Sequence, residues 1–230
     1  HFRITAIERL HVLFDQGRQF SSTHGWGPIL GLLFPRGLML LDFEEHRLHR
    51  RALSVAFKSG PMKSYLVDLD RGIATRVKQW KAQPGEMLVY PAMKQLTLDL
   101  AATSFLGAEI GPEVDEITRA FIDMVAAAVA PIRRPLPFTQ MGRGVAGRKY
   151  LIDYFGPQIA ERRRNENRQD MFSQFATATR EDGSLMPVDE VVDHMIFLMM
   201  AAHDTITSSA SSLVWLLARN PEWQDKLRAE

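Results

Sequence analysis

The sequence contains no cysteine, which excludes disulfides, cysteine-ligated zinc or iron–sulfur sites and thiol nucleophiles within its 230 residues. It also lacks an apolar run of about 18 residues, the length that a helix needs to cross a bilayer. Neither charge is in excess: 28 lysines and arginines stand against 27 acids, so the net charge of +1 gives no reason to expect nucleic acid as a partner. We expect a soluble segment on the cytoplasmic side, with no membrane span.

The composition is that of an ordinary globular protein, with 46% hydrophobic and 24% charged residues. The chain begins with His1 rather than methionine, and a helix that starts at Pro221 runs out at Glu230. No repeat, low-complexity tract or bare linker divides the sequence. We therefore expect residues 1–230 to form a single incomplete domain, truncated at both ends.

Helical periodicity is nearly continuous along the chain, and strand signals are scarce. The predicted fold class is mainly α, with minimal β structure. Helices are expected at about 4–16, 43–57, 62–82, 92–106, 112–130, 144–166, 169–179 and from 187 to 220. Glycines and prolines predict a loop over 21–37 and an extended linker over 131–138, and 87–90 is the best strand candidate.

The last of these helices is unusually long. Pro187 suits its first turn, where two acids follow, and Asn220 ends it while serving as the N-cap of the next helix. Roughly 30 residues at 1.5 Å each give about 45 Å of helix, against a usual ~11–12 residues. A helix of this length is expected to cross the middle of the domain.

A polar notch, defined here as residues 203–205, interrupts the apolar side of this helix. Thr205 can hydrogen-bond to the carbonyl of Ala201 one turn earlier, which tends to bend a helix and leaves a polar niche beside Asp204. Small residues share one helix side here: Ala201, Ala202, Thr205, Ser208, Ser209 and Ser212. The notch is either a helix–helix contact with satisfied polar groups or a place where Asp204 delivers protons to a ligand. His203 points away from Thr205 and is interpreted as a packing residue.

A second motif, EEHRLHRR at 44–51, places His46 and Arg50 one turn apart on the same side of a helix. They form a cationic donor pair suited to carboxylates or phosphates. The alternative is a solvated face whose basic groups are neutralised by Glu44 and Glu45.

In this order and separation, the motifs resemble those of cytochrome P-450, the haem-thiolate monooxygenase family. GLMLLD at 37–42 with EHRLHRR at 45–51 is similar to the family's loop and helix C, written as Trp or His, three residues, then Arg. AAHDTI at 201–206 is similar to the centre of helix I, and NPEWQDKL at 220–227 resembles the start of helix J. The resemblance covers essentially the whole chain and implies the helical portion of that fold, helices B to J.

The resemblance also implies roles in binding haem, the family's cofactor. His46 and Arg50 would donate to a haem propionate. Ala201 and Ala202 would lie against the distal face of the porphyrin and leave room for O2, although Ala202 stands where glycine is commoner in the family.

The remaining implied roles concern the reaction. Asp204 and Thr205 would deliver protons as the O–O bond breaks, with Ile206 replacing the family's second threonine. Residues 27–38 and 135–138 would lie near the pocket of a hydrophobic small-molecule substrate. The complete enzyme would also take electrons from a redox partner.

Two hallmarks of the family are missing from the sequence. Its iron ligand is a cysteine thiolate, and a Glu-x-x-Arg motif follows its helix J; neither is present here in the corresponding place. We therefore expect the distal, helical half of a truncated monooxygenase, with no metal ligand of its own. By itself this chain is expected neither to hold haem tightly nor to turn over.

Two other classes of function stay open at this point. Asp189 and Asp193 lie one turn apart, as in the magnesium motif of an all-α prenyl-diphosphate enzyme, although acids at a helix start are also expected for dipole reasons. A non-catalytic helical binding or scaffold domain would use the small-residue side as a docking groove. A metal site shared by His194 and His203 is excluded, because residues nine apart lie on opposite helix faces.

Overall fold

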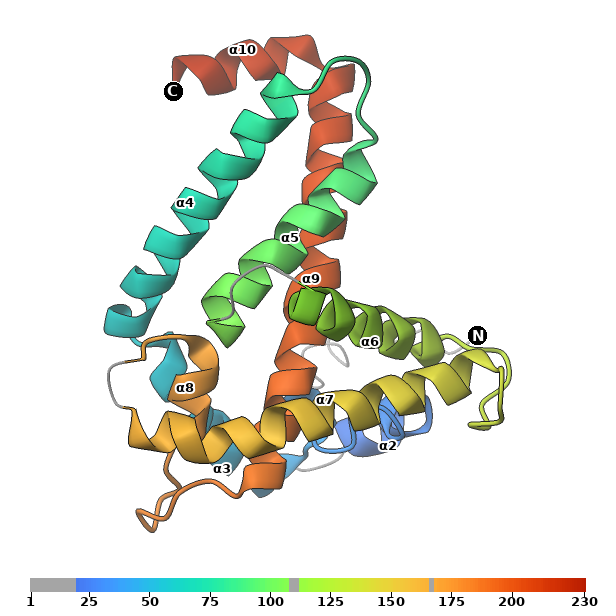
Figure 1. Cartoon of the computed structure of the whole chain (residues 1–230), viewed down its shortest axis with the longest axis vertical. Helices are drawn as coiled ribbons and strands as arrows, with labels where there is room; N and C mark the ends of the chain where they lie inside the picture. The colour runs from blue at the N-terminus through green and yellow to red at the C-terminus, as the bar shows by residue number, and fades with distance from the viewer. Residues whose placement is uncertain (1–19, 108–111, 166–167) are drawn as a thin grey trace.

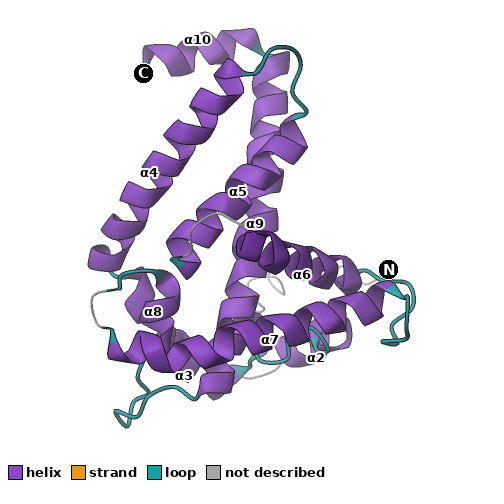
Figure 2. Ribbon diagram, in the orientation of Figure 1, coloured by secondary structure: helices purple, strands orange, loops and turns teal. Residues whose placement is uncertain are grey.

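The computed structural model describes residues 20–107, 112–165 and 168–230, and this part of the chain is almost entirely helical (Figure 2). Its α-helices are α2 (Ser22–Leu30), α3 (Phe43–Leu53), α4 (Ser59–Ala82), α5 (Val89–Leu106), α6 (Pro112–Ala128), α7 (Gln140–Arg164), α8 (Met171–Ala176), α9 (Val188–Arg219) and α10 (Pro221–Ala229). Two 3-10 turns, Leu38–Leu40 and Ser54–Phe57, flank α3. Within the described ranges, extended pairing is limited to one antiparallel bridge between Thr179 and Leu185. The mainly α prediction is confirmed; the helix expected at 4–16 lies outside the described residues.

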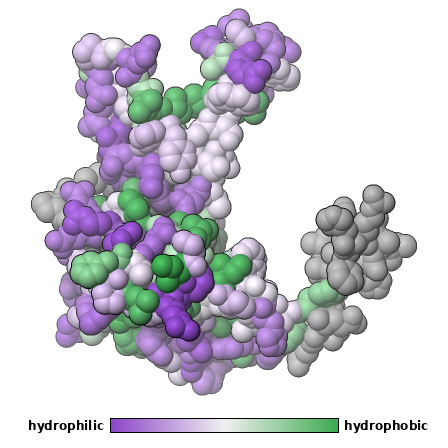
Figure 3. All heavy atoms as spheres, turned by 90° about the vertical axis from the view of Figure 1, so that its right-hand side faces the viewer, coloured by the Kyte–Doolittle hydropathy of each residue, from purple (hydrophilic) through white to green (hydrophobic). Residues whose placement is uncertain are grey.

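Helix α9 is the axis of the molecule and spans its height in Figure 1. It contains 32 residues, with Asp189 and Glu190 in the first turn. Their negative charges interact favourably with the positive end of the helix dipole. The buried residues of α9 all lie between Glu190 and Thr207. Beyond them Leu213 and Trp215 are more than half exposed, and hydrophobic residues lie between the two upper projections in Figure 3. The predicted long central helix is confirmed.

Helices α6 and α7 lie side by side below the middle of α9 (Figure 1). Two glycines of α7 make this close approach possible. A Cβ atom on Gly147 would lie 2.6 Å from the carbonyl oxygen of Ala120, and one on Gly144 would collide with the side chain of Ala127. Beneath them, Phe155, Phe172 and other large apolar side chains form a core shared with α8 and the first half of α9.

The loop predicted over 21–37 is wrong for its first part, because residues 22–30 form α2. Its start is stabilised from a distance: the carboxylate of Asp42 accepts a hydrogen bond from the backbone N–H of Ser22 at 2.7 Å. Ser21 adds a local cap by accepting from His24 N–H at 3.0 Å. The helix therefore forms in spite of its two glycines and of Pro28 because a residue 20 positions away supplies the acceptor that its first turn needs.

The strand predicted over 87–90 is also wrong. Val89 begins α5, and Pro91 occupies the first helical turn, where its missing N–H costs no hydrogen bond. Leu88 is 77% exposed, so it has no neighbouring strand to pair with in the described structure. The other end of α5 agrees with expectation, since Gly107 adopts the left-handed conformation (φ 59°) that terminates the helix.

Asn220 occupies the N-cap position of α10, as predicted, but its side chain does not cap that helix. Its side-chain amide donates to the carbonyl of Leu216 at 2.7 Å and so closes α9, and it makes no capping hydrogen bond to α10. In the described ranges, no helix has both the length and the apolar character needed to cross a membrane.

Candidate functional site

A cavity of about 370 Å³ lies between α3 and α9 and is lined by Arg50 of the EEHRLHRR motif and by Ala201, two residues before the notch. Its wall is mostly apolar and comes from five elements: Leu38, Arg50, Leu53, Ser54, Phe57, Phe175, His194, Phe197, Leu198 and Ala201. On α9 the contributing positions are spaced three and four residues apart, so one face of that helix forms one wall. Arg50 supplies the cationic group of the wall, and Ala201 supplies its smallest side chain.

Arg50 is available to a ligand because other arginines form ion pairs with the nearby Glu44 and Glu45. Arg47 donates to Glu44 from its Nε at 2.9 Å, and Arg36 donates to Glu45, also at 2.9 Å. Across the described ranges, Arg50 has no side-chain hydrogen bond or ion pair. The alternative of a solvated face neutralised by Glu44 and Glu45 describes Arg47, which pairs with Glu44, but Arg50 is exposed and pairs with neither acid.

The structure does not bring His46 to the same wall. It is half-buried one turn before Arg50 on α3 and does not line the cavity. Of the predicted donor pair, only the guanidinium reaches the space next to Ala201.

The polar notch of α9 has the geometry predicted for its hydroxyl. Thr205 Oγ1 donates to the carbonyl oxygen of Ala201 at 2.8 Å, and the Thr205 side chain is exposed. Asp204 lies on another side of the helix and lines a second cavity of about 250 Å³ between α5, α6 and α9. Ala202 is half-buried and lines neither cavity.

His203 is packed, as predicted. It is 7% exposed, and its Nδ1 lies 2.9 Å from the hydroxyl of Thr97 on α5. His194, two and a half turns earlier, contacts α3 instead. The two histidines therefore face different helices, and within the described ranges no cluster of acids and histidines could hold a metal ion.

Sequence reasoning missed a buried pair of histidines beside the first cavity. His49 Nδ1 on α3 and His194 Nε2 on α9 are 2.7 Å apart, and the carboxylate of Glu190 lies 3.7 Å from His49 Nε2. Burial, then the nearby His49, lowers the pKa of His194 to about 3. Burial also lowers the pKa of His49, although Glu190 acts in the opposite direction. Because the partners are 145 residues apart, no local pattern could have revealed the pair.

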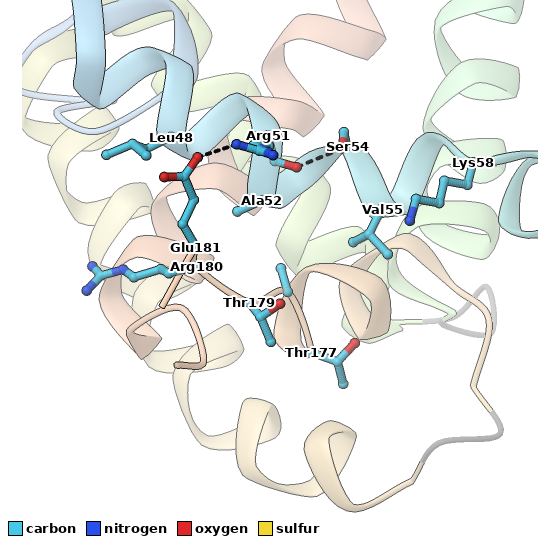
Figure 4. Close-up of a pocket in the computed structure, with 11 residues that line it drawn as sticks. Leu48, Arg51, Ala52, Ser54, Val55, Lys58, Thr177, Thr179, Arg180 and Glu181 are labelled. Atoms are coloured by element: carbon cyan, nitrogen blue, oxygen red, sulfur yellow. Dashed lines mark hydrogen bonds and ion pairs between the residues drawn. The ribbon is translucent and has the colours of Figure 1, made fainter. Parts of the chain in front are cut away.

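A third cavity, of about 400 Å³, is polar and lies between α3, the following 3-10 turn and the turn after α8 (Figure 4). In it Arg51 and Glu181 point toward each other and form an ion pair, with Lys58 at the opposite end. The ion pair neutralises Arg51, whereas Lys58 and Arg180 also line this cavity.

The magnesium motif considered above is not assembled. Asp193 is buried and forms an ion pair with Arg148 of α7. Its carboxylate is therefore engaged within the core rather than presented to a diphosphate-bound cation.

Comparisons with known proteins bear on the family and the fold of this chain. The family model for cytochrome P450 matches residues 9–230. Cytochrome P450 136 of Mycobacterium tuberculosis is 40% identical over 223 residues, which is 95% of this chain and 45% of that protein. Human cytochrome P450 26B1 is 27% identical over 236 residues, which is 99% of this chain and 45% of that protein. A cyanobacterial CYP120A1 bound to retinoic acid superimposes with a TM-score of 0.83 at 25% identity, covering 98% of this chain and 51% of the other. The chain spans about half the length of the relatives it matches.

Proposed function

This chain belongs to the cytochrome P450 family, and on that basis we propose that it forms the distal, helical side of a haem-thiolate monooxygenase. The complete enzyme would activate O2 and hydroxylate a hydrophobic organic substrate, with electrons from a redox partner. The observation that carries the proposal is the cavity in which Arg50 of α3 and Ala201 of α9 face a common space.

The residues of this cavity fit a haem. A porphyrin is flat and apolar with two carboxylates at one edge, and the cavity combines an apolar wall with one unpaired guanidinium. We assign Arg50 to a propionate and Ala201 to the side facing the porphyrin. Ala202, the next residue on α9, and His46, one turn before Arg50, lie outside the lining of this cavity and are proposed to border the haem beyond it. Bound haem would supply the iron at which O2 is activated; the cysteine ligand is not in this sequence.

Thr205 and Asp204 are proposed to hold the protons that the reaction consumes. Thr205 Oγ1 is one turn from Ala201 and already donates a hydrogen bond to that residue's carbonyl. Because Thr205 is exposed, its hydroxyl can turn to a ligand at little cost. Asp204 is 42% exposed, which allows its carboxylate to exchange protons with solvent.

The substrate is proposed to reach the site past two segments, 27–38 and 135–138. Arg133, in the linker before the second segment, donates to the carbonyl oxygens of Pro28 and Ile29 and so ties the linker to α2. Phe138 is fully exposed and Leu32 is 55% exposed, so this end of the molecule offers apolar contacts.

Haem titration of the purified chain, followed by absorbance, tests the proposal. Binding is expected to be weak, because the thiolate ligand is absent, and carbon monoxide is expected to give no thiolate-type Soret band. Arg50→Leu should weaken binding about tenfold, the value of a charge-assisted hydrogen bond. Arg47→Leu is the matched control, since Arg47 is already paired with Glu44. Equal affinity of the Arg50 variant and the unmodified chain would refute the assignment.

A further inference from the structure

A buried polar cluster lies behind the notch, where α9 crosses α5. His203 Nδ1 and Thr207 Oγ1 of α9 both lie within 2.9 Å of the hydroxyl of Thr97 on α5, at 2.9 and 2.8 Å. All three residues are more than nine-tenths buried. The other ring nitrogen of His203, Nε2, is buried without a hydrogen-bond partner and lies 3.7 Å from the carboxylate of Asp204.

The carboxylate of Asp204 favours one of the two tautomers of His203. A carboxylate beside Nε2 favours a proton on that nitrogen, because a bare lone pair would face a negative charge. Nδ1 of His203 then accepts from the hydroxyl of Thr97. The hydroxyls of Thr97 and Thr207 each have a second acceptor, the carbonyl oxygens of Lys94 at 3.0 Å and of His203 at 2.9 Å. Hydrogen bonding alone would therefore also allow Nδ1–H to donate to Thr97, and the charge of Asp204 decides between the two tautomers.

We propose that His203 is a positioning residue for Asp204: its Nε2 carries a proton and attracts the carboxylate 3.7 Å away, and Thr97 of α5, as donor to Nδ1, supports this tautomer. The part of the inference that concerns proton delivery rests on the function proposed above. The contact itself does not, since it is formed by this chain alone.

The surroundings of the pair are compatible with this role. The cavity that Asp204 lines receives Lys94 and Tyr90 from α5, whereas its α6 side is apolar, with Phe121 and Val125. Burial lowers the pKa of His203, the charge of Asp204 acts to raise it, and Lys94 acts to lower it. Neutral His203 is therefore the resting form at pH 7, as the arrangement requires.

Nitrogen-15 NMR of the histidine rings in the full chain tests the proposal without haem. In the unmodified chain we expect His203 to be protonated on Nε2. Asp204→Asn should lower the midpoint of the His203 titration by about one pH unit, the lower end of the effect of an adjacent opposite charge. Asp225→Asn is the matched control, because Asp225 is an exposed acid paired with Arg228 and should leave His203 unchanged.

The role of Thr97 is tested by a second pair of variants. Thr97→Val should give a mixture of His203 tautomers, and Thr97→Ser, which retains the hydroxyl, should restore the single form. A His203 ring protonated on Nδ1, or a titration that Asp204→Asn does not move, would overturn the proposal. Both of those measurements stand even if Thr97→Val fails to fold. Equal haem affinity of Arg50→Leu and of the unmodified chain would refute the proposed function while leaving these results unaffected.

Discussion

Acid should destabilise this protein through His194. The residue is 2% exposed and shares a short contact with His49, and its pKa falls to about 3 from 6.5 in an unfolded chain. Between these two pKa values, His194 is protonated in the unfolded chain and neutral in the folded chain. The free energy of unfolding therefore decreases as the pH falls below 6.5, and His194 has no such effect above pH 7.

The magnitude follows from the two pKa values. Each pH unit below 6.5 removes about 1.4 kcal/mol until the folded pKa is reached, so at pH 5 His194 alone should cost about 2 kcal/mol. A loss of this size is a large part of the total stability of an ordinary domain, about 5–15 kcal/mol. It should be visible as a clear shift of the unfolding midpoint.

Urea unfolding followed by far-UV circular dichroism at pH 7 and pH 5 measures this contribution. His194→Gln removes the titrating ring but keeps a hydrogen-bond donor for His49. The unmodified chain should therefore lose about 2 kcal/mol more stability between pH 7 and pH 5 than this variant does. His24→Gln, at an exposed position of α2, should show the full pH dependence. If His194→Gln loses as much stability at pH 5 as the unmodified chain, the reasoning is wrong.

Three further predictions concern the fold. Asp42→Ala should lower the stability of the chain by about 1 kcal/mol and reduce its helicity, because the start of α2 loses its acceptor. Stability should also fall at low pH, since hydrogen bonds to α2 outweigh burial and lower the pKa of Asp42. Gly147→Val should cost roughly 1–3 kcal/mol in urea unfolding, because its Cβ would meet the carbonyl of Ala120. Asp170→Asn should cost about 3–5 kcal/mol by leaving the buried guanidinium of Arg162 uncompensated, and Arg162→Met in the same background should recover part of it in a double-mutant cycle.

The helical architecture could be predicted because its signals are local. Periodicity and capping residues lie within a few positions of the helices they define, so α9 and the end of α5 at Gly107 agree with expectation. The errors occur where a distant group decides the outcome. Helix α2 depends on Asp42, which lies 20 residues from Ser22, and no local pattern contains that contact.

At the site, too, contacts within one helix could be predicted and contacts between helices could not. The notch hydroxyl of Thr205 is placed as its spacing to Ala201 predicts, since both atoms belong to one helix. Whether Arg50 or His46 would reach the cavity depends on the rotation of α3 against α9, which only the packed structure determines. The pairing of His49 with His194 depends on the same contact between helices.

Arg162 and Arg163 are adjacent basic residues that the fold uses internally. Arg162 is 4% exposed and donates to the carbonyl of Leu106, while Arg163 donates to the carbonyls of Ala176 and Met186. These guanidinium groups satisfy carbonyl oxygens at helix ends and in loops. Their role is structural, and they are not available to a nucleic acid or an acidic partner.

The uneven burial of α9 has a consequence for its motions. Residues from Glu190 to Thr207 are held by side chains of α3, α5, α7 and α8, whereas the turns around Leu213 and Trp215 have large apolar surfaces in contact with water. One continuous backbone thus contains two regions of different local stability. Amide hydrogens in the first region should exchange with deuterium only on global unfolding, and those in the second should exchange by fraying, with the boundary a few residues beyond the Thr205 hydroxyl.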